Sequence, residues 1–207
     1  PQGVAQNIIG LSSAAGEINL PEDVIITSTD DVIVSGVFLG SINAGGQNTL
    51  SDKGNGDAYV VKILKTGATD WLVSAGSSGG LERGYSVAES STGDILVGGI
   101  ISRLTDFGIH TIDTNGGLDL YMAQLDSNGN WDWVENLGSV NDDLFADLAV
   151  NMSDIPAAFG SFQSTINKGS MSVTSSGGLD LVVWALDPVN NQDLSLIHIS
   201  EPTRRVF

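Results

Sequence analysis

His110 is the residue whose side chain is best suited to acid–base or metal chemistry near neutral pH. It lies in the stretch DFGIHTID, between Asp106 and Asp113. A histidine beside carboxylates can bind a metal ion or act as a general base. No partner residue stands at the spacing that zinc sites use, and a solvated histidine in a polar loop gives the same pattern. We therefore keep His110 as a candidate ligand-binding residue and assign no catalytic residue.

Oxygen-bearing side chains alternate along a second stretch, which contains Asp126, Asn128, Asn130 and Asp132. Calcium loops place ligands in this way, but an EF-hand needs Gly at the sixth position, where this chain has Trp131, and a closing Glu, which is absent. A looser group of the same kind contains Asp113, Asn115 and Asp119. Hairpin and Asx turns between strands are the favoured explanation for both groups. Structural calcium is the one cofactor that these residues suggest, and no other is expected.

Three tryptophans could stack on a sugar, because an indole face suits the apolar side of a pyranose ring. Trp71 and Trp133 stand 62 positions apart within a repeat described below, so we expect them to pack between neighbouring repeats. Trp131 has no counterpart in the first repeat, where Thr69 takes its place. Alternation along a strand predicts Trp131 and Trp133 on one face and Asp132 on the other. Trp131 is therefore the better candidate for ligand binding.

An internal repeat about sixty residues long organises these side chains. Its best-preserved motif reads GNGDAYVVKILKTGATDW from Gly54, GGLDLYMAQLDSNGNWDW from Gly116 and GGLDLVVWALDPVNNQDL from Gly177. A second motif has the same period and reads DDVIVSG from Asp30, GDILVGG from Gly93 and, more weakly, SDIPAAFG from Ser153. Periods of this length are typical of propellers, solenoids and arrays, in which one unit cannot bury its apolar face without its neighbours.

The aspartates Asp57, Asp119 and Asp180 recur in every copy of the repeat. A catalytic group would be unique to one copy, so recurrence indicates a structural role. A carboxylate at the start of a strand can accept backbone N–H groups from the adjoining loop. We expect these three residues to fix the loop at the corner of each repeat.

Short alternating runs bounded by Gly, Asn, Asp and Ser predict four strands in each period. In the second repeat they cover residues 85–89, 95–100, 118–125 and 131–136, with hairpin turns at 92–94 and 127–129. Pro156 predicts a short or bulged second strand in the third repeat. Four antiparallel strands repeated radially form a propeller blade.

We expect an all-β partial β-propeller within residues 1–193, with about three blades at 24–84, 85–144 and 145–193. Residues 1–23 would hold the outer strand of a preceding blade and a linker.

The repeats resemble the bacterial β-propeller repeat family of secreted and surface proteins. Its blades carry an Asp-Ala-Tyr/Phe-Val-x-Lys-Leu strand, then Trp, then Gly-Asn-x-Tyr-Val-x-Gly, and DAYVVKI from Asp57 is the nearest match here. The resemblance spans about residues 24–193. It implies a propeller fold and an extracellular or cell-surface location, and it implies no particular chemistry.

The end of the chain departs from the repeat. The period predicts an outer-strand Trp at position 194, but Leu194 stands there and opens the peptide LSLIHISEPTR. This peptide resembles the translation of a transposase-type sequencing adapter. We therefore predict that residues 194–207 are a non-native tail that packs poorly or irregularly. The alternative is a genuine C-terminal strand, SLIHI.

Composition narrows the class of partner. The chain of 207 residues has 25 acidic and 8 basic side chains and a formal net charge of −17, which argues against binding nucleic acid or anionic lipid. It has no cysteine for a disulfide framework, and no apolar run approaches the length of a membrane-spanning helix. A glycan, a protein ligand and the remaining blades of a longer chain are the partners that this composition allows.

The sequence favours a non-catalytic binding or structural module. Its ligand would contact the long connections between second and third strands, at 39–56, 102–117 and 161–178. The predicted inner strands VIIT, YSVAE and DLAV are mostly apolar, as expected of a binder. A polysaccharide lyase or hydrolase and a calcium-dependent adhesion repeat remain alternatives, because fold does not determine function.

Overall fold

The described part of the chain is built from β-strands. The computed structural model describes residues 10–14, 16–46, 48–187 and 192–199, and within these ranges it contains no helix. None of the described residues belongs to a helix that could cross a membrane.

Three antiparallel sheets of four strands follow one another along the chain. The first sheet contains β1 (Ile18–Ile26), β2 (Val32–Leu39), β5 (Asp57–Ile63) and β6 (Thr69–Ala75). The second contains β7 (Arg83–Glu89), β8 (Ile95–Ile101), β11 (Asp119–Leu125) and β12 (Trp131–Leu137). The third contains β13 (Leu144–Val150), β14 (Pro156–Phe162), β17 (Asp180–Asp187) and β18 (Gln192–Ile199).

The all-β prediction is confirmed, and the four strands of the second repeat lie within two residues of their predicted bounds. Residues 18–23, which the sequence suggested as linker, form the first part of β1. The prediction of a short or bulged second strand in the third repeat is wrong. The strand β14 has the same length as β8 and pairs with β17 without a shift of register. Pro156 stands at its first position, where a strand tolerates a residue that has no backbone N–H.

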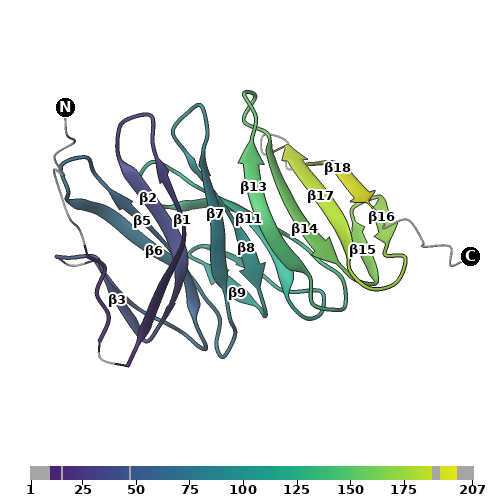
Figure 1. The fold of residues 1–207 in the computed structure, drawn as a ribbon, viewed down its shortest axis with the longest axis horizontal. Coiled ribbons are helices and arrows are strands. Elements are labelled where there is room, and N and C mark those ends of the chain that lie inside the picture. Colours follow the sequence, from purple (N-terminus) through teal and green to yellow (C-terminus); the bar gives the residue numbers. More distant parts are fainter. Residues whose placement is uncertain (1–9, 15, 47, 188–191, 200–207) are drawn as a thin grey trace, which may run out of the picture.

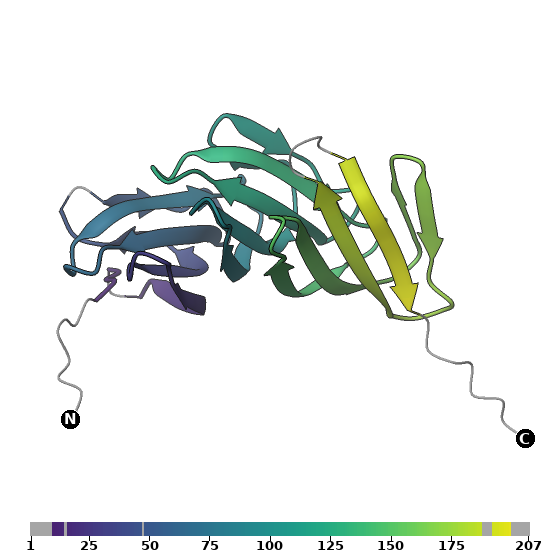
Figure 2. The same ribbon diagram turned by 90° about the horizontal axis from the view of Figure 1, so that it is seen from above.

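The sheets stand side by side in sequence order and pack face to face along an arc (Figures 1 and 2). Side chains alternate along each strand, so a middle sheet presents apolar residues on both faces. Along β11, Tyr121 and Ala123 enter a core shared with the first sheet, whereas Leu120 and Met122 enter a core shared with the third. The free face of the first sheet is covered by its own connection, which contributes Ile42.

The turns between first and second strands recur in backbone conformation. Asp30, Gly93 and Asp154 occupy equivalent positions and have φ angles of 66°, 87° and 58°. Gly adopts this left-handed region readily, and Asp adopts it at some cost. The hairpin turn predicted at 127–129 likewise has Gly129 at a φ of 80°.

Neighbouring turns are joined across the sheets. Ser28 donates its backbone N–H and its hydroxyl to the carboxylate of Glu89, at 2.7 and 3.0 Å. Ser91 makes the same pair of hydrogen bonds to Asp154, both at 2.6 Å. Each sheet is therefore linked to the next at its turns as well as through its core.

The prediction that the segment from Leu194 packs irregularly is wrong for residues 194–199, which lie in a regularly paired strand. That strand is β18, which pairs with β17 through Ile199 and shifts register once, between Ala185 and Leu186. The outer strands β6 and β12 show the same bulge, opposite Lys62 and Ile63 of β5 and opposite Gln124 and Leu125 of β11. The third sheet therefore has a complete set of four strands. The foreign origin of residues 194–207 stays a prediction, and residues 200–207 lie outside the described ranges.

The long connections between second and third strands are structured. Each contains a two-stranded hairpin: β3 (Ser41–Asn43) with β4 (Thr49–Ser51), β9 (Thr105–Phe107) with β10 (His110–Ile112), and β15 (Thr165–Lys168) with β16 (Met171–Thr174). Phe107 and Ile166 anchor the second and third hairpins in the shared cores and are fully buried. These connections are part of the scaffold rather than free loops.

Candidate functional site

The recurring aspartates Asp57, Asp119 and Asp180 are buried at the start of β5, β11 and β17. Each carboxylate accepts the backbone N–H of the residue four positions earlier. The donors are Lys53, Asn115 and Ser176, at 3.1, 2.9 and 2.6 Å. This is the loop contact that the sequence suggested. It occupies all three carboxylates in the same structural task.

Glycines pack directly against two of these carboxylates. A Cβ atom on Gly76 would lie 1.9 Å from Asp57 Oδ2, and one on Gly138 would lie 2.2 Å from Asp119 Oδ1. Neither glycine has room for a side chain. The carboxylates of Asp57 and Asp119 therefore fill space that any other residue would need.

A second pair of buried acids, which sequence reasoning left without a role, recurs at the same junctions. Glu82 accepts hydrogen bonds from the N–H and hydroxyl of Ser77, at 2.9 and 2.8 Å. Asp143 accepts the same two bonds from Ser139, at 2.5 and 3.1 Å. The signal in the sequence was a Gly-Ser pair with an acid a few residues later, recurring with the period of the repeat.

Burial dominates the electrostatics of these four acids. It raises the pKa of Asp57 and Asp143 to about 6, and it raises the pKa of Glu82 and Asp119 as well. Repulsion within each junction acts in the same direction, between Asp57 and Glu82 and between Asp119 and Asp143. Such groups store electrostatic strain, but none is exposed to a substrate.

The predicted calcium ligands in the β11–β12 turn are already occupied by hydrogen bonds. Asp126 accepts the backbone N–H groups of Asn128 and Asn130, at 2.9 and 2.8 Å, and the side-chain amide of Asn130 at 3.0 Å. The Asn130 side chain, followed by these backbone donors, lowers the pKa of Asp126. Asp132 is exposed and lies apart from this turn, within β12. The turn explanation accounts for this alternation of oxygen ligands.

The residues predicted around His110 do not assemble into a metal site either. His110 lies on β10 opposite Phe107 rather than in an open loop. The Asp106 carboxylate pairs with Lys53 Nζ at 2.8 Å, and Asp113 accepts the N–H of Thr114. In the described ranges, no group of three or more His, Cys, Asp or Glu side chains is placed to hold a metal ion.

Asn115, the remaining predicted ligand, donates both its backbone N–H and its side-chain amide to Asp119, at 2.9 and 3.0 Å. The amide nitrogen of Asn115 is therefore used as a donor inside the loop.

Trp71 and Trp131 are buried between sheets and Trp133 is partly buried, but Trp131 and Trp133 do not share a face. The β12 bulge makes Gln124 pair with Trp133 and Leu125 with Trp131, so Asp132 is the extra residue. Trp131 therefore faces the first sheet and Trp133 the third. Trp131 donates its indole N–H to Ser74 O at 3.4 Å and is 7% exposed, so most of its surface is used in packing.

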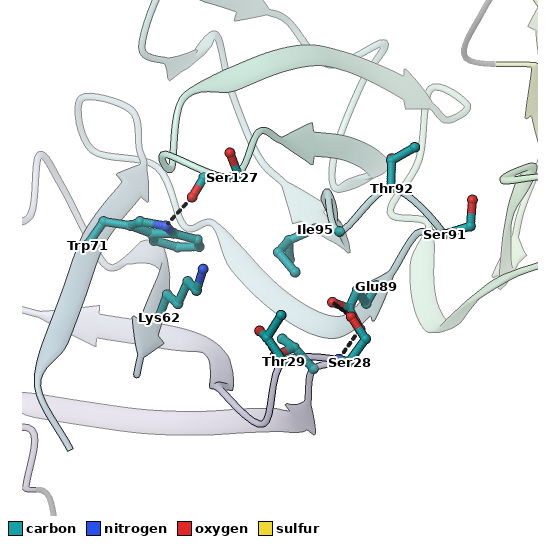
Figure 3. A pocket seen from close by; sticks show the side chains of 11 residues that line it. Ser28, Thr29, Lys62, Trp71, Glu89, Ser91, Thr92, Ile95 and Ser127 are labelled. Carbon is teal, nitrogen blue, oxygen red and sulfur yellow. Dashed lines mark hydrogen bonds between the residues drawn. The ribbon is translucent and has the colours of Figure 1, made fainter. Parts of the chain in front are cut away.

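Trp71 packs between sheets as predicted and also borders a cavity. Its indole N–H donates to Ser127 O of the second sheet at 3.2 Å, and Gly129 lies against its ring. A cavity of about 240 Å³ opens beside it between the first two sheets (Figure 3). We call it the junction cavity. Trp71 and Lys62 lie on one side and Glu89 on the other (Figure 3). Its hydroxyl-bearing residues are Thr27, Ser28, Thr29, Ser91, Thr92 and Ser127.

No model of a known protein family matches this chain, and no curated protein matches it. What bears on its function is therefore the chemistry of its own residues.

Proposed function

We propose that this chain is part of a β-propeller and serves as a non-catalytic binding or structural module. The arrangement of the inner strands supports the propeller. The hydroxyl of Ser86 on β7 donates to the carboxylates of Asp147 on β13, at 2.9 Å, and of Asp23 on β1, at 3.3 Å. These three residues occupy equivalent positions, so three successive sheets meet at one hydroxyl. Sheets that meet along their first strands and diverge outward have the geometry of blades.

The third sheet supports the presence of further blades. Its face away from the second sheet carries Phe159, Leu181 and Ile197, which are 38%, 40% and 51% exposed. The corresponding face of the second sheet is covered by the third, and Leu120, the equivalent of Leu181, is fully buried there. An additional four-stranded sheet is therefore the partner that this face fits best.

The observation that carries the non-catalytic role is the use of the buried acids. At both junctions each acid accepts hydrogen bonds from backbone or serine donors and recurs with the repeat. A polysaccharide lyase or hydrolase requires carboxylates that reach the substrate. The adhesion alternative requires calcium ligands, and the most promising of these, Asp126, is occupied by its own turn.

The proposed location, outside the cell or at its surface, rests on the resemblance of the repeat to the bacterial β-propeller repeat family. A neutral glycan or a protein is the class of ligand compatible with a chain of net charge −17.

A direct experiment separates binding from catalysis. The purified chain is incubated with a panel of neutral and acidic polysaccharides, and both retention of the protein and release of reducing or unsaturated ends are measured. We expect retention on a neutral glycan without product. Release of product that increases with protein concentration would contradict the non-catalytic role.

A further inference from the structure

Among the charged groups of the junction cavity, Lys62 has no charged counterpart in the other sheets. The contact of Glu89 does recur, because Asp154 accepts from Ser91 the same two hydrogen bonds that Glu89 accepts from Ser28. The position of Lys62 is taken by Gln124 in the second sheet, and that of Glu89 by Val150 in the third. By contrast, Trp71 has its counterpart in Trp133. Groups that every repeat shares hold the scaffold together. The charge of Lys62, found at one junction only, is therefore not required by the packing of the sheets.

The charges around the cavity disfavour an anionic ligand. Lys62 Nζ lies 3.5 Å from both Asp31 and Asp70, so its charge is already balanced by two carboxylates. Glu89 adds a third carboxylate on the opposite side. The distance of 3.5 Å is longer than a strong charged hydrogen bond, which leaves the ammonium able to donate to a ligand.

The cavity offers donors and acceptors together. Lys62 provides N–H donors, and Glu89 provides carboxylate acceptors that already hold Ser28 at 2.7 and 3.0 Å. The serine and threonine hydroxyls can act in either way. A polyhydroxylated ligand, whose OH groups both donate and accept, satisfies such a set without carrying a charge.

The indole of Trp71, of which 8% is exposed, gives the cavity a small and rigid apolar wall. Ser127 fixes its N–H at 3.2 Å, and Gly129 covers part of the ring, where a Cβ would come within 2.8 Å. A fixed aromatic wall binds an apolar ring face with little loss of conformational entropy. The volume of about 240 Å³ lies below the usual range of about 300–1,000 Å³ for pockets that hold drug-sized ligands, which suits a single ring.

We propose that the junction cavity binds one pyranose ring of a neutral saccharide. Trp71 contacts the apolar side of the ring, Lys62 donates to a ring hydroxyl or ether oxygen, and Glu89 accepts from the hydroxyls on the other side. This inference rests on the proposed binding role, and it puts the ligand between the first two sheets rather than on the long connections.

Indole N–H signals in ¹⁵N-labelled protein provide the test. Glucose, galactose, mannose and N-acetylglucosamine are titrated separately to about 100 mM, well above the millimolar dissociation constants expected for so small a ligand. We expect at least one sugar to shift the Trp71 signal saturably. The Trp133 signal, from the equivalent position in the second sheet, should not move.

Variants taken from the repeat itself locate the site. Lys62→Gln and Glu89→Val introduce the residues found at the equivalent positions, and each should weaken binding about tenfold or more, because a charged hydrogen bond is lost. Lys53→Gln is the matched control. It removes a lysine that is 47% exposed and pairs with Asp106 away from the cavity, so it should leave binding unchanged. Unfolding midpoints show whether each variant remains folded.

Three results would overturn the inference. They are the absence of any saturable Trp71 shift, equal binding by Lys62→Gln and the parent, and stronger binding of free glutamate or lysine than of the sugars. If a polysaccharide is retained while the Trp71 signal stays still, the cavity assignment fails and the binding role stands. Turnover of a bound sugar would instead contradict the non-catalytic role.

Discussion

The four acids at the sheet junctions combine full or nearly full burial with a pKa that is raised rather than lowered. Asp57, Glu82, Asp119 and Asp143 are all inaccessible to solvent. Their hydrogen bonds favour the charged form, but the desolvation that burial imposes is larger. Ionisation of these groups near neutral pH therefore destabilises the folded state, in a chain that is already strongly negative.

Stability should rise as the pH is lowered from neutral. Burial raises the pKa of Asp57 and Asp143 to about 6, whereas an aspartate in an unfolded chain titrates at about 3.9. Between these values the folded state holds protons that the unfolded chain has released, so stability falls as pH rises. We expect the free energy of unfolding to be higher at about pH 5 than at about pH 7, by on the order of 2 kcal/mol. Urea unfolding at both pH values measures the difference.

One variant tests whether the carboxylates cause this dependence. Asp57 Oδ1 accepts the Lys53 N–H, while Oδ2 has no hydrogen-bond partner among the described residues. Asp57→Asn keeps the acceptor and removes the charge, so it should stabilise the protein by about 1 kcal/mol near pH 7 and reduce the slope. Asp57→Ala, the control, loses the loop contact and should destabilise the protein at both pH values. A parent protein that is more stable at neutral pH would contradict the account.

The β11–β12 turn should be stabilised by hydrogen bonds and not by calcium. Asp126 accepts three donors from Asn128 and Asn130, so Asp126→Ala should cost about 1 kcal/mol of unfolding free energy. Calcium or a chelator should leave the unfolding midpoint of the parent unchanged, since the carboxylate is occupied. Thermal melts of both proteins, with calcium and with chelator, measure both effects. A rise in the midpoint with calcium that Asp126→Ala abolishes would establish the ion site instead.

At the scale of the elements, the side chains that face each other across the two sheet junctions are matched in size at one equivalent position. Ser35 of the first sheet lies against Gly84 of the second, where a Cβ would come within 3.3 Å of the serine Cβ. At the next junction the sizes are reversed. Gly98 of the second sheet lies against Phe145 of the third, and a Cβ on Gly98 would be 2.4 Å from the phenyl ring. At each junction, a glycine on one sheet therefore makes room for the side chain that faces it from the other sheet.

Alanine should have opposite effects at the equivalent positions Ser35 and Gly98. Gly98→Ala forces a methyl group into the Phe145 ring and should destabilise the protein by about 1–3 kcal/mol. Ser35→Ala removes a buried hydroxyl that has no hydrogen-bond partner among the described residues, so it should be neutral or stabilising by up to about 1 kcal/mol. Denaturant unfolding compares the two variants. Equal losses at both positions would show that the junctions are not matched in this way.

The elements that sequence could predict are those governed by local periodicity. The strands around Asp57 and Asp119 and the turn at Gly93 follow from alternation and from turn chemistry, and the structure contains them. The faces of Trp131 and Trp133 could not be predicted, because the bulge at Asp132 reverses the alternation and depends on pairing with β11. Periodicity along one strand carries no information about its register with another.

The candidate site was missed for a related reason. Lys62 and Glu89 lie on different sheets, 27 positions apart in sequence. Lys62 belongs to the strand motif DAYVVKI, but that motif gives no sign of Glu89. Their proximity depends on how the first two sheets stack. Comparison of the repeats could have identified both residues, because each departs from its equivalents in an otherwise matching strand.

At the scale of the whole molecule, charge and exposed apolar area act in opposite directions. The net charge of −17 keeps copies of the chain apart, and the third sheet presents Phe159 and Leu181 to solvent at 38% and 40% exposure. A contiguous apolar face on a soluble chain marks an interaction surface. Which effect dominates depends on ionic strength, because the Debye length falls from about 30 Å at 0.01 M salt to about 3 Å at 1 M.

Self-association of the isolated chain should therefore increase with salt and should depend on the third sheet. Sedimentation velocity at about 0.01 M and 1 M salt should show monomer at the lower value and association at the higher one, as screening removes the repulsion. Phe159→Thr combined with Leu181→Thr should weaken the association about tenfold, because the apolar contact is lost while strand propensity is kept. Ile109→Thr, which replaces a side chain 90% exposed on the β9–β10 hairpin, is the matched control and should associate like the parent. If the double variant also associates like the parent, the third sheet does not form the contact and another surface of the chain does.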